Sequence, residues 1–248
     1  MKNLIYIVSI DHHQSKTKCS SYADYCFATW EYWCSKNNCD LIIEKEGDPK
    51  FGKAMWNKTN VINLGKKYNK IGIVDTDTMI RWNTPNIFEM YTNEFCGVVD
   101  TSDFRWILNS IQVYQKFFPS IKLNIDNYIN SGVMFFTNEH LFLFEQLQKF
   151  YLENKNELDN WNLGGGKDQT IINYHLNKNL IKCKILDPSW NLVAIHKKDM
   201  FKYNWQLNND ATPYFIKYAY IWHFTGFPVE HRENIMKDTW NIIKENYK

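Results

Sequence analysis

The sequence predicts one α/β domain in which helices cover both faces of a mostly parallel central sheet. Short apolar runs rich in β-branched residues alternate with longer stretches whose apolar residues recur every three or four positions. Such alternation of strands and helices is typical of a parallel sheet covered on both faces. The 248 residues fit one large domain, and we find no linker, repeat or low-complexity tract that would divide them.

The first third of the chain is predicted to alternate strand and helix, ending on a strand. Residues 4–10 are apolar and rich in isoleucine and valine, which predicts a buried strand, and a polar loop over 11–18 follows it. Over 22–35, tyrosine, cysteine and tryptophan recur at three- and four-residue steps, as they would on one face of a helix. The same two patterns then predict a strand over 40–44, a helix over 54–68 and a strand over 70–75.

The remaining chain continues the alternation. Residues 95–99 form another apolar run, which ends at Asp100, and 141–151 has the periodicity of a long amphipathic helix. Further strands are expected over 132–136, 183–186 and 220–223, and further helices over 107–117, 168–176 and 235–247.

Composition narrows the classes of partner and the cellular location. The formal net charge is +2, so there is no electrostatic case for a nucleic-acid partner. Aromatic residues make up 17% of the chain, which suits a thick core, stacking on sugars or bases, or peripheral contact with a membrane surface. No apolar run approaches the ~20 residues that span a bilayer, and the N-terminal apolar run is interpreted as a strand, not a signal peptide.

Six cysteines occur without a CxxC pair or a zinc-knuckle spacing. Four of them lie in the first forty residues, so a local zinc or disulfide cluster stays open as an alternative. Buried free thiols are the favoured interpretation, and they indicate a reducing, cytoplasmic location.

The most informative motif is the pair Asp75 and Asp77 at the end of the predicted strand over 70–75. Ligands of open α/β sheets bind at the carboxyl ends of the strands. Two carboxylates placed there repel each other unless a positive charge lies between them. A hard divalent cation that carries phosphates meets this requirement. The alternative is a strand-capping aspartate followed by a second aspartate in a solvated turn.

Two further motifs adjoin predicted strands. Asn130, Ser131 and Gly132 come directly before the apolar strand residues 133–136, where amide groups and a glycine would let a ligand approach the backbone. His223 and Gly226 follow the strand over 220–223 as His-x-x-Gly. Taken singly, the first motif is compatible with an ordinary turn and the histidine with a hydrogen-bonded core residue.

A glycine-rich loop precedes the helix over 168–176. Residues 164–167 read Gly-Gly-Gly-Lys, yet they are not a phosphate-binding loop, because Trp161 replaces its first glycine and Asp168 its Ser/Thr. Asp168 and Gln169 at the start of the helix would instead hydrogen-bond hydroxyl groups, or Asp168 is a plain helix N-cap.

Taken in order, these four motifs resemble the glycogenin-like family 8 of nucleotide-sugar glycosyltransferases, and the resemblance covers residues 4–226. It implies a single Rossmann-like nucleotide-sugar-binding domain of the A-type fold. Residues 1–100 would bind the nucleotide sugar, and residues 101–248 would bind the acceptor and complete the metal site. The implied activity transfers a hexose or pentose from a UDP-sugar to a glycan or glycoconjugate, with retention of the anomeric configuration.

The resemblance also assigns roles to residues. Asp75, Asp77 and His223 would bind the metal, and two carboxylates with one imidazole suit Mn²⁺ better than Mg²⁺. Asn130, Asp168 and Gln169 would face the donor sugar and the reacting bond. The remaining donor-binding positions would be Ser9 and Asp11 for base and ribose, Lys58 for sugar or phosphates, and Ser131, Gly132 and Gly226.

Two features depart from the family pattern. Members usually have a lysine three residues after the glycine of His-x-x-Gly, and this chain has Val229 there. Arg232 and Lys197 are candidates for the replacement charge. The segment over 100–130 is also rich in aromatic residues, so one or two of them are candidates for stacking on an acceptor sugar.

Two other functions were weighed. A non-catalytic nucleotide-sugar or carbohydrate-binding module would use the same pocket, and Val229 favours it. A haloacid-dehalogenase-type phosphatase also has a strand-ending DxD, but it requires Thr or Val where Met79 stands, and no later acidic pair for Mg²⁺ is found.

Overall fold

A computed structural model describes residues 2–11, 21–160, 167–196 and 212–248. Its centre is a six-stranded sheet in the order β2-β1-β3-β6-β5-β7. Strand β6 is antiparallel to both of its neighbours, and the other three pairings are parallel. The predicted α/β fold with a mostly parallel sheet is therefore confirmed. The strands are β1 (Asn3–Val8), β2 (Cys39–Glu44), β3 (Lys70–Asp75), β5 (Phe95–Val99), β6 (Ile129–Thr137) and β7 (Cys183–Ile185).

Both faces of the sheet are buried, each in its own apolar core. Along β1, Leu4 and Tyr6 contribute to one core, whereas Ile5 and Ile7 contribute to the other, because successive side chains of a strand point to opposite faces. This two-sided burial explains why the strands read as continuous apolar runs.

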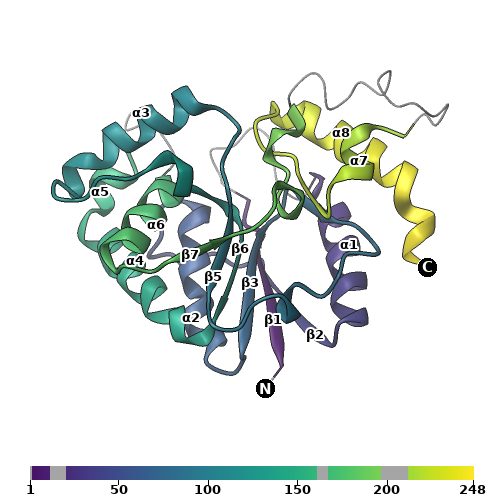
Figure 1. Cartoon of the computed structure of the whole chain (residues 1–248), viewed down its shortest axis with the longest axis horizontal. Coiled ribbons are helices and arrows are strands. Elements are labelled where there is room, and N and C mark those ends of the chain that lie inside the picture. The colour runs from purple at the N-terminus through teal and green to yellow at the C-terminus, as the bar shows by residue number, and fades with distance from the viewer. Residues whose placement is uncertain (1, 12–20, 161–166, 197–211) are drawn as a thin grey trace.

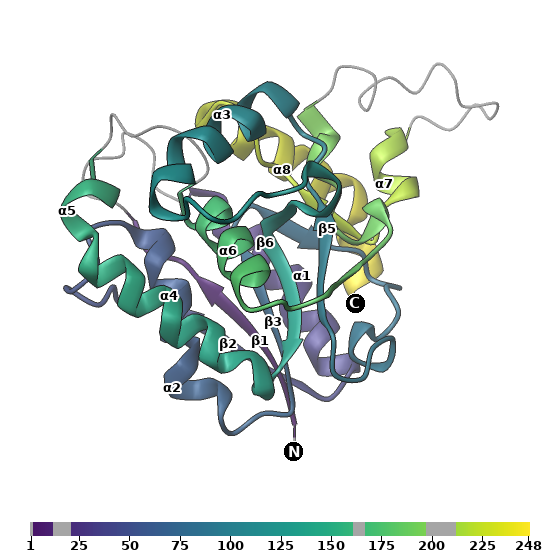
Figure 2. The same cartoon turned by 60° about the vertical axis from the view of Figure 1, so that its left-hand side comes forward.

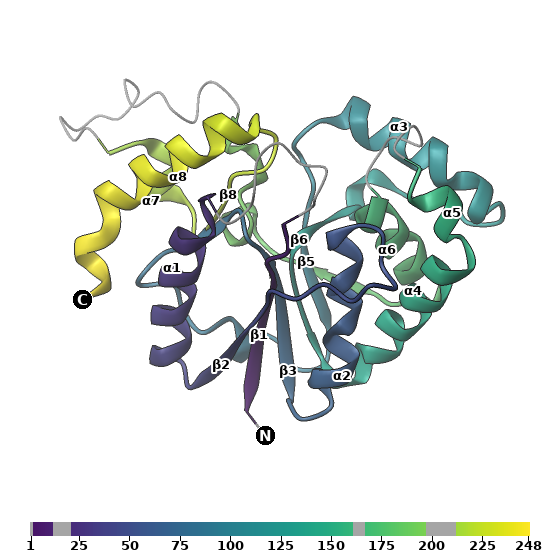
Figure 3. The ribbon, with the colours of Figure 1, turned by 180° about the vertical axis from the view of Figure 1, so that it is seen from behind.

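Helices cover both faces, as the sequence predicts. Figures 1 and 2 show α2, α4 and α6 on one side of the sheet, and Figure 3 shows α1 and α8 together on the other. Helix α1 packs through Trp30 and Trp33, whose indole nitrogens donate to Thr78 Oγ1 and to the Thr84 carbonyl at 3.1 Å each. The α-helices are α1 (Ala23–Lys36), α2 (Val61–Gly65), α3 (Phe104–Tyr114), α4 (Leu141–Glu153), α5 (Lys155–Leu158), α6 (Lys167–Lys178), α7 (Tyr214–Tyr218) and α8 (Val229–Ile243).

A second, two-stranded sheet brings distant parts of the sequence together. Strand β4 (Thr78–Ile80) pairs antiparallel with β8 (Ile221–His223), and Thr78 lies opposite His223. The backbone N–H of Phe224 also donates to the carbonyl of Asp77 at 2.8 Å. Since β4 begins directly after Asp77, this small sheet places the late histidine beside the DxD turn.

Some predicted elements differ from the observed ones. Asn130, Ser131 and Gly132 lie inside β6, which begins at Ile129, so both their predicted place before the strand and the alternative of an ordinary turn are wrong. The pairing of β5 with β6 is irregular next to them, between Gly97 and Val99. Residues 54–68, expected as one helix, form a 3-10 helix η2 (Ala54–Asn60) followed by the short α2. The loop over 11–18 lies almost wholly outside the described residues.

Five of the six cysteines lie within the described ranges, and all five are free. Cys26, Cys34 and Cys96 are buried, as the favoured interpretation expects, whereas Cys39 and Cys183 are half-buried and Cys19 lies outside those ranges. None of the helices described has both the length and the apolar character needed to cross a bilayer.

Candidate functional site

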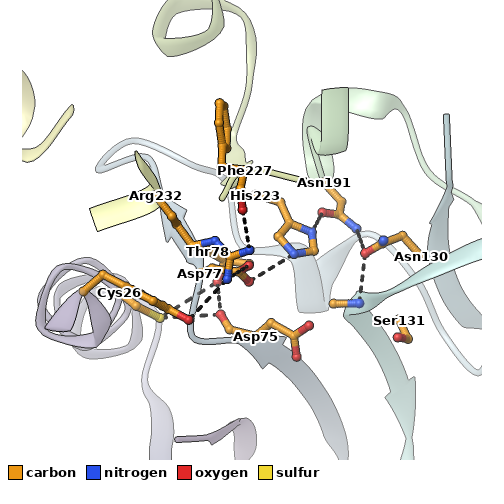
Figure 4. Close-up of polar contacts among 12 residues, drawn as sticks. Cys26, Asp75, Asp77, Thr78, Asn130, Ser131, Asn191, His223, Phe227 and Arg232 are labelled. Atoms are coloured by element: carbon orange, nitrogen blue, oxygen red, sulfur yellow. Dashed lines mark hydrogen bonds and ion pairs between the residues drawn. The ribbon is translucent and has the colours of Figure 1, made fainter. Parts of the chain in front are cut away.

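Three side chains predicted as metal ligands converge at the carboxyl end of β3. One ligand atom each from Asp75, Asp77 and His223 lie within 4.8 Å of one another. His223 Nε2 is 3.2 Å from Asp77 Oδ1 (Figure 4). Two ligand atoms that are each about 2.1 Å from a metal ion, at a right angle, are about 3 Å apart. Asp77 and His223 are therefore spaced as adjacent ligands of one divalent cation.

Gly132 leaves the space in which this cluster forms. A Cβ at this position would lie 2.2 Å from His223 Cε1 and 2.9 Å from Asp75 Oδ2. Any side chain would thus displace the imidazole or the carboxylate. The glycine of the predicted Asn-Ser-Gly motif allows two candidate ligands to approach the backbone of β6, and the residues present fit a metal ion.

Lys58 neutralises two of the acidic groups. From η2 its Nζ lies 2.8 Å from Asp75 Oδ1 and 3.1 Å from Asp168 Oδ2, and it donates to the Ser131 carbonyl at 3.2 Å. Burial would lower the pKa of Lys58, but the charges of Asp168 and Asp75 raise it above its ordinary value. For Asp75, burial prevails over Lys58 and raises the pKa. A positive Lys58 therefore links Asp75 to Asp168.

Arg232, from α8, forms an ion pair with Asp77 and neutralises its charge. Its guanidinium is 3.1 Å from Asp77 Oδ2 and donates to the Tyr22 hydroxyl and the Phe227 carbonyl at 3.3 Å each. Burial would raise the pKa of Asp77, but the guanidinium of Arg232 holds it well below its usual range. Asp77 thus remains ionised, with Oδ2 held by Arg232 and Oδ1 directed at His223.

A network of buried polar side chains lies behind the ligands. Asn130 donates to Asp100 Oδ2 at 3.1 Å and to Gln169 Oε1 at 3.0 Å, and Gln169 donates to Asp100 Oδ2 at 2.8 Å. Asn191 donates to Asn130 Oδ1 at 3.1 Å, and its own Oδ1 is 3.0 Å from His223 Nδ1. This network connects the Asn130 and Gln169 motifs to the candidate metal ligand.

Sequence reasoning assigned no role to Asp100 or Asn191. Asp100 follows the apolar run 95–99 as Asp75 follows 70–74, and this repeated pattern is a signal that points to it. Asn191 follows the 3-10 helix η8 (Pro188–Trp190) and belongs to no motif, so no local signal marks it.

A cavity of about 400 Å³ opens onto the cluster. Of the other predicted donor-binding residues, Ser9 and Asp11 are half-buried beyond β1, and their neighbours Val8 and Ile10 line the cavity. The glycine-rich residues 164–166 lie outside the described ranges. Nine predicted site residues line the cavity: Lys58, Asp75, Asp77, Asn130, Ser131, Gly132, Asp168, Gln169 and His223.

A second cavity of about 420 Å³ adjoins the first. Both are lined by Trp106, Asn130, Gln169 and Thr225, so the two cavities are adjacent. Gly226, at a φ of 80° that favours glycine, lines the second one. The described residues around it include the carboxylates of Asp100 and Asp103 and no lysine or arginine.

The amino-acid sequence matches no model of a known protein family and no curated protein. Solved structures do match. The fold resembles a glycosyltransferase involved in glycosylation of the major capsid of PBCV-1, with a TM-score of 0.59 and 16% identity over 96% of this chain and 100% of that one.

Two further structures are similar. The WbbM bifunctional glycosyltransferase matches with a TM-score of 0.51 and 14% identity over 99% of this chain and 51% of that one. Mouse xyloside xylosyltransferase 1 has a TM-score of 0.46 and 12% identity, covering 90% and 96% of the two chains. The capsid-glycosylating enzyme and WbbM show that this chain has a glycosyltransferase fold.

Proposed function

We propose that the protein is a metal-dependent glycosyltransferase, which transfers a sugar from a nucleotide sugar to a glycan or glycoconjugate. The observation that carries the proposal is the Asp75–Asp77–His223 cluster beside a cavity, in a chain with a glycosyltransferase fold. A UDP-sugar donor, Mn²⁺ and retention of anomeric configuration are the finer parts of the proposal, as is the place in family 8. A mixed carboxylate and imidazole set favours Mn²⁺ over Mg²⁺.

The charges around the cluster suit a diphosphate. A divalent cation held by Asp75, Asp77 and His223 would supply Lewis-acid stabilisation of the negative charge on the departing nucleoside diphosphate. Lys58 Nζ lies at the same cavity and adds a second positive charge. Arg232 does not line the cavity but orients Asp77, and Val229 is half-buried against the apolar core at the start of α8. We therefore assign Lys58 to the donor phosphates and Arg232 to the orientation of Asp77.

Asp168 is the acidic group that we place beside the donor sugar. Its Oδ2 contacts Lys58 Nζ at 3.1 Å and accepts a hydrogen bond from Ser131 Oγ at 3.3 Å, which fixes the carboxylate at the wall of the cavity. From there it would position the sugar and stabilise positive charge that develops at the anomeric carbon. Asn130 and Gln169 line the same wall.

The second cavity is our candidate for the acceptor. Its carboxylates would repel a diphosphate but accept hydrogen bonds from sugar hydroxyls, and Trp106 offers an aromatic face at the boundary with the donor cavity. An acceptor sugar bound there would lie next to the donor sugar.

The proposal is tested by measuring UDP-sugar hydrolysis without acceptor, in Mn²⁺ and in chelator. Asp75→Ala and Asp77→Ala should abolish hydrolysis because each removes a ligand. Asp168→Asn should keep donor affinity and lower turnover by about a hundredfold, the scale of one electrostatic contact in a reaction. Lys237→Met, at an exposed position of α8, is the control and should match the wild type. Wild-type rates for Asp75→Ala and Asp77→Ala would refute the site.

A non-catalytic nucleotide-sugar-binding module remains the second candidate, because Val229 stands where the resembled family has a lysine. Metal-dependent donor binding without any hydrolysis would support it over the enzyme.

A further inference from the structure

We propose that Asn191 is a positioning residue that selects the tautomer of His223, so that the Nε2 lone pair is directed toward the metal position. The inference rests on the metal site of the proposed function, but its first test needs no metal. Figure 4 shows the residues involved, from Asn130 through Asn191 to His223 and Asp77.

The orientation of Asn130 is determined by two independent partners. The backbone N–H of Gly132 lies 2.9 Å from one end of the Asn130 amide, and an N–H only donates, so that end is the oxygen. The other end lies 3.1 Å from Asp100 Oδ2 and 3.0 Å from Gln169 Oε1, so it is the NH₂ group. Gln169 Oε1 is itself identified as an oxygen by the N–H of Ser131 at 3.2 Å.

The orientation of Asn191 follows from that of Asn130. The end of Asn191 that lies 3.1 Å from Asn130 Oδ1 must be its NH₂ group, because the oxygen only accepts. Its oxygen then faces His223 Nδ1 at 3.0 Å, and Nδ1 must carry the hydrogen. The backbone N–H groups of Gly132 and Ser131 thus determine the orientation of Asn130, which determines that of Asn191. The orientation of Asn191 in turn determines which nitrogen of His223 carries the hydrogen.

The backbone brings Asn191 to His223 and buries the contact. Leu192, the next residue, pairs with Trp222 as an isolated parallel bridge, and its N–H donates to the Ile221 carbonyl at 3.0 Å. Asn191 and His223 are only 1% and 2% exposed. A buried donor or acceptor left without a partner destabilises the fold, so the hydrogen bonds of the whole network oppose rotation of either amide.

With hydrogen on Nδ1, Nε2 presents its lone pair to Asp77 Oδ1 at 3.2 Å. Two acceptors at this distance require a positive group between them. The opposite tautomer would place a hydrogen on Nε2, satisfy Asp77 and block the metal position. Asn191 therefore makes His223 a ligand, by the same principle by which hydrogen-bonded partners orient metal-binding histidines.

The first test is ¹⁵N NMR of the histidine rings in metal-free protein, at a pH well above the ordinary histidine pKa. The His223 signals are assigned by their loss in His223→Gln. We expect wild-type His223 to carry hydrogen on Nδ1, whether or not a proton also lies between Nε2 and Asp77. Asn191→Leu should abolish this preference, because it removes the acceptor at nearly constant volume.

Asn57→Leu is the matched control. Asn57 is 2% exposed, accepts from the Asp48 N–H at 2.8 Å and donates to the Ala54 carbonyl at 3.0 Å, without contact to the network around Asn191. It should lose stability as Asn191→Leu does but keep the His223 tautomer. A wild-type tautomer in Asn191→Leu would overturn the inference.

The second test is Mn²⁺ affinity, from the electron paramagnetic resonance of free Mn²⁺. Asn191→Leu should bind Mn²⁺ about 10- to 100-fold more weakly, the usual effect of losing such a partner, while Asn57→Leu binds it as the wild type does. Asn191→Asp should restore affinity, because an acceptor again faces Nδ1. Equal affinity in wild type and Asn191→Leu would contradict the inference. If the wild type itself binds no Mn²⁺, the proposed metal site fails, and the NMR result still decides the role of Asn191.

Discussion

Among single residues, Gly132 bears most directly on whether Asp75 and His223 can come together. The space beside its Cα is filled by His223 and Asp75, which belong to two different sheets. The motif containing Gly132 was identifiable in the sequence because it adjoins an apolar run. The reason for the glycine was not, because the imidazole that occupies its side-chain space lies 91 residues further along the chain (223 − 132).

Gly132→Ala is expected to weaken Mn²⁺ binding by on the order of a hundredfold, because its Cβ would displace His223 from the other ligands. Gly47→Ala is the control, since a Cβ there would meet Ile10 at an ordinary 3.4 Å. Calorimetric titration with Mn²⁺ measures the affinity of both variants and of the wild type. Unchanged affinity in Gly132→Ala would show that His223 is not a ligand.

His175 makes a separate prediction about stability. It is 2% exposed, and neither of its ring nitrogens has a hydrogen-bond partner among the described residues. Phe118 and Phe150 pack against it edge to face. Burial lowers the pKa of His175 to about 4. As the pH is lowered, the unfolded chain therefore takes up a proton near pH 6.5, whereas the folded chain takes it up only near pH 4. The free energy of unfolding thus decreases as the pH decreases from about 6.5 to about 4.

His175→Phe should raise the free energy of unfolding at pH 7 by about 1–3 kcal/mol, because it removes two unsatisfied polar atoms. It should also remove about 2 kcal/mol of the stability loss between pH 7 and pH 5. Urea unfolding at both pH values measures this, with the exposed His231→Gln as control. If His175→Phe were destabilised and its stability depended on pH as that of the wild type does, His175 would not be the buried, neutral histidine described above.

Among the secondary-structure elements, strands were easier to predict than helix type and strand ends. Strand β3 was evident because it is buried on both faces. Strand β4 was missed because Thr78–Ile80 is too short to show a pattern, although its pairing with β8 brings His223 to the cluster. The start of β6 was misplaced because its polar residues, used in the buried network, resemble a turn.

Helix α3 contributes Trp106 to the wall shared by the two cavities. The aromatic excess over 100–130 predicted stacking positions, but buried and exposed rings could not be distinguished without the fold. Tyr114 and Phe118 are core residues, whereas Trp106 is 38% exposed and lines both cavities. Its place near the start of α3 is fixed by the Asp103 side chain, which accepts from the Trp106 N–H at 3.1 Å.

Trp106→Ala should raise the acceptor KM about tenfold, the equivalent of 1.4 kcal/mol of lost stacking, while donor hydrolysis without acceptor changes by less than about twofold. Phe104→Ala is the control, because Phe104 is 53% exposed on the same helix and lines neither cavity. Steady-state kinetics with a panel of simple glycosides as acceptors separates the two effects. An unchanged acceptor KM in Trp106→Ala would show that the acceptor does not bind in this cavity.

In the whole molecule, the site assembles from parts of the chain that lie far apart in sequence, and both sheets help to bring them together. The sequence predicted the alternating strands and helices. The resemblance to a known family pointed to Asp75, Asp77 and His223, which the fold brings close enough to bind a metal ion. The sequence did not predict the contacts among the site residues, such as Lys58 with Asp168 or Arg232 with Asp77, since these depend on the arrangement of elements distant in sequence. The roles proposed for Ser9, Asp11 and Gly226 and the cytoplasmic location stay predictions.

The most direct test of the metal-dependent nucleotide-sugar site is a thermal-shift panel of UDP-, GDP-, dTDP- and CMP-sugars, each with Mn²⁺ and with chelator. Ligands that bind the native state raise the melting temperature by mass action. We expect UDP-sugars with Mn²⁺ to raise it by roughly 5 to 10 °C at a hundred times the dissociation constant, and chelator to abolish the shift. No shift with any nucleotide sugar, or a shift that persists in chelator, would contradict the metal-dependent site.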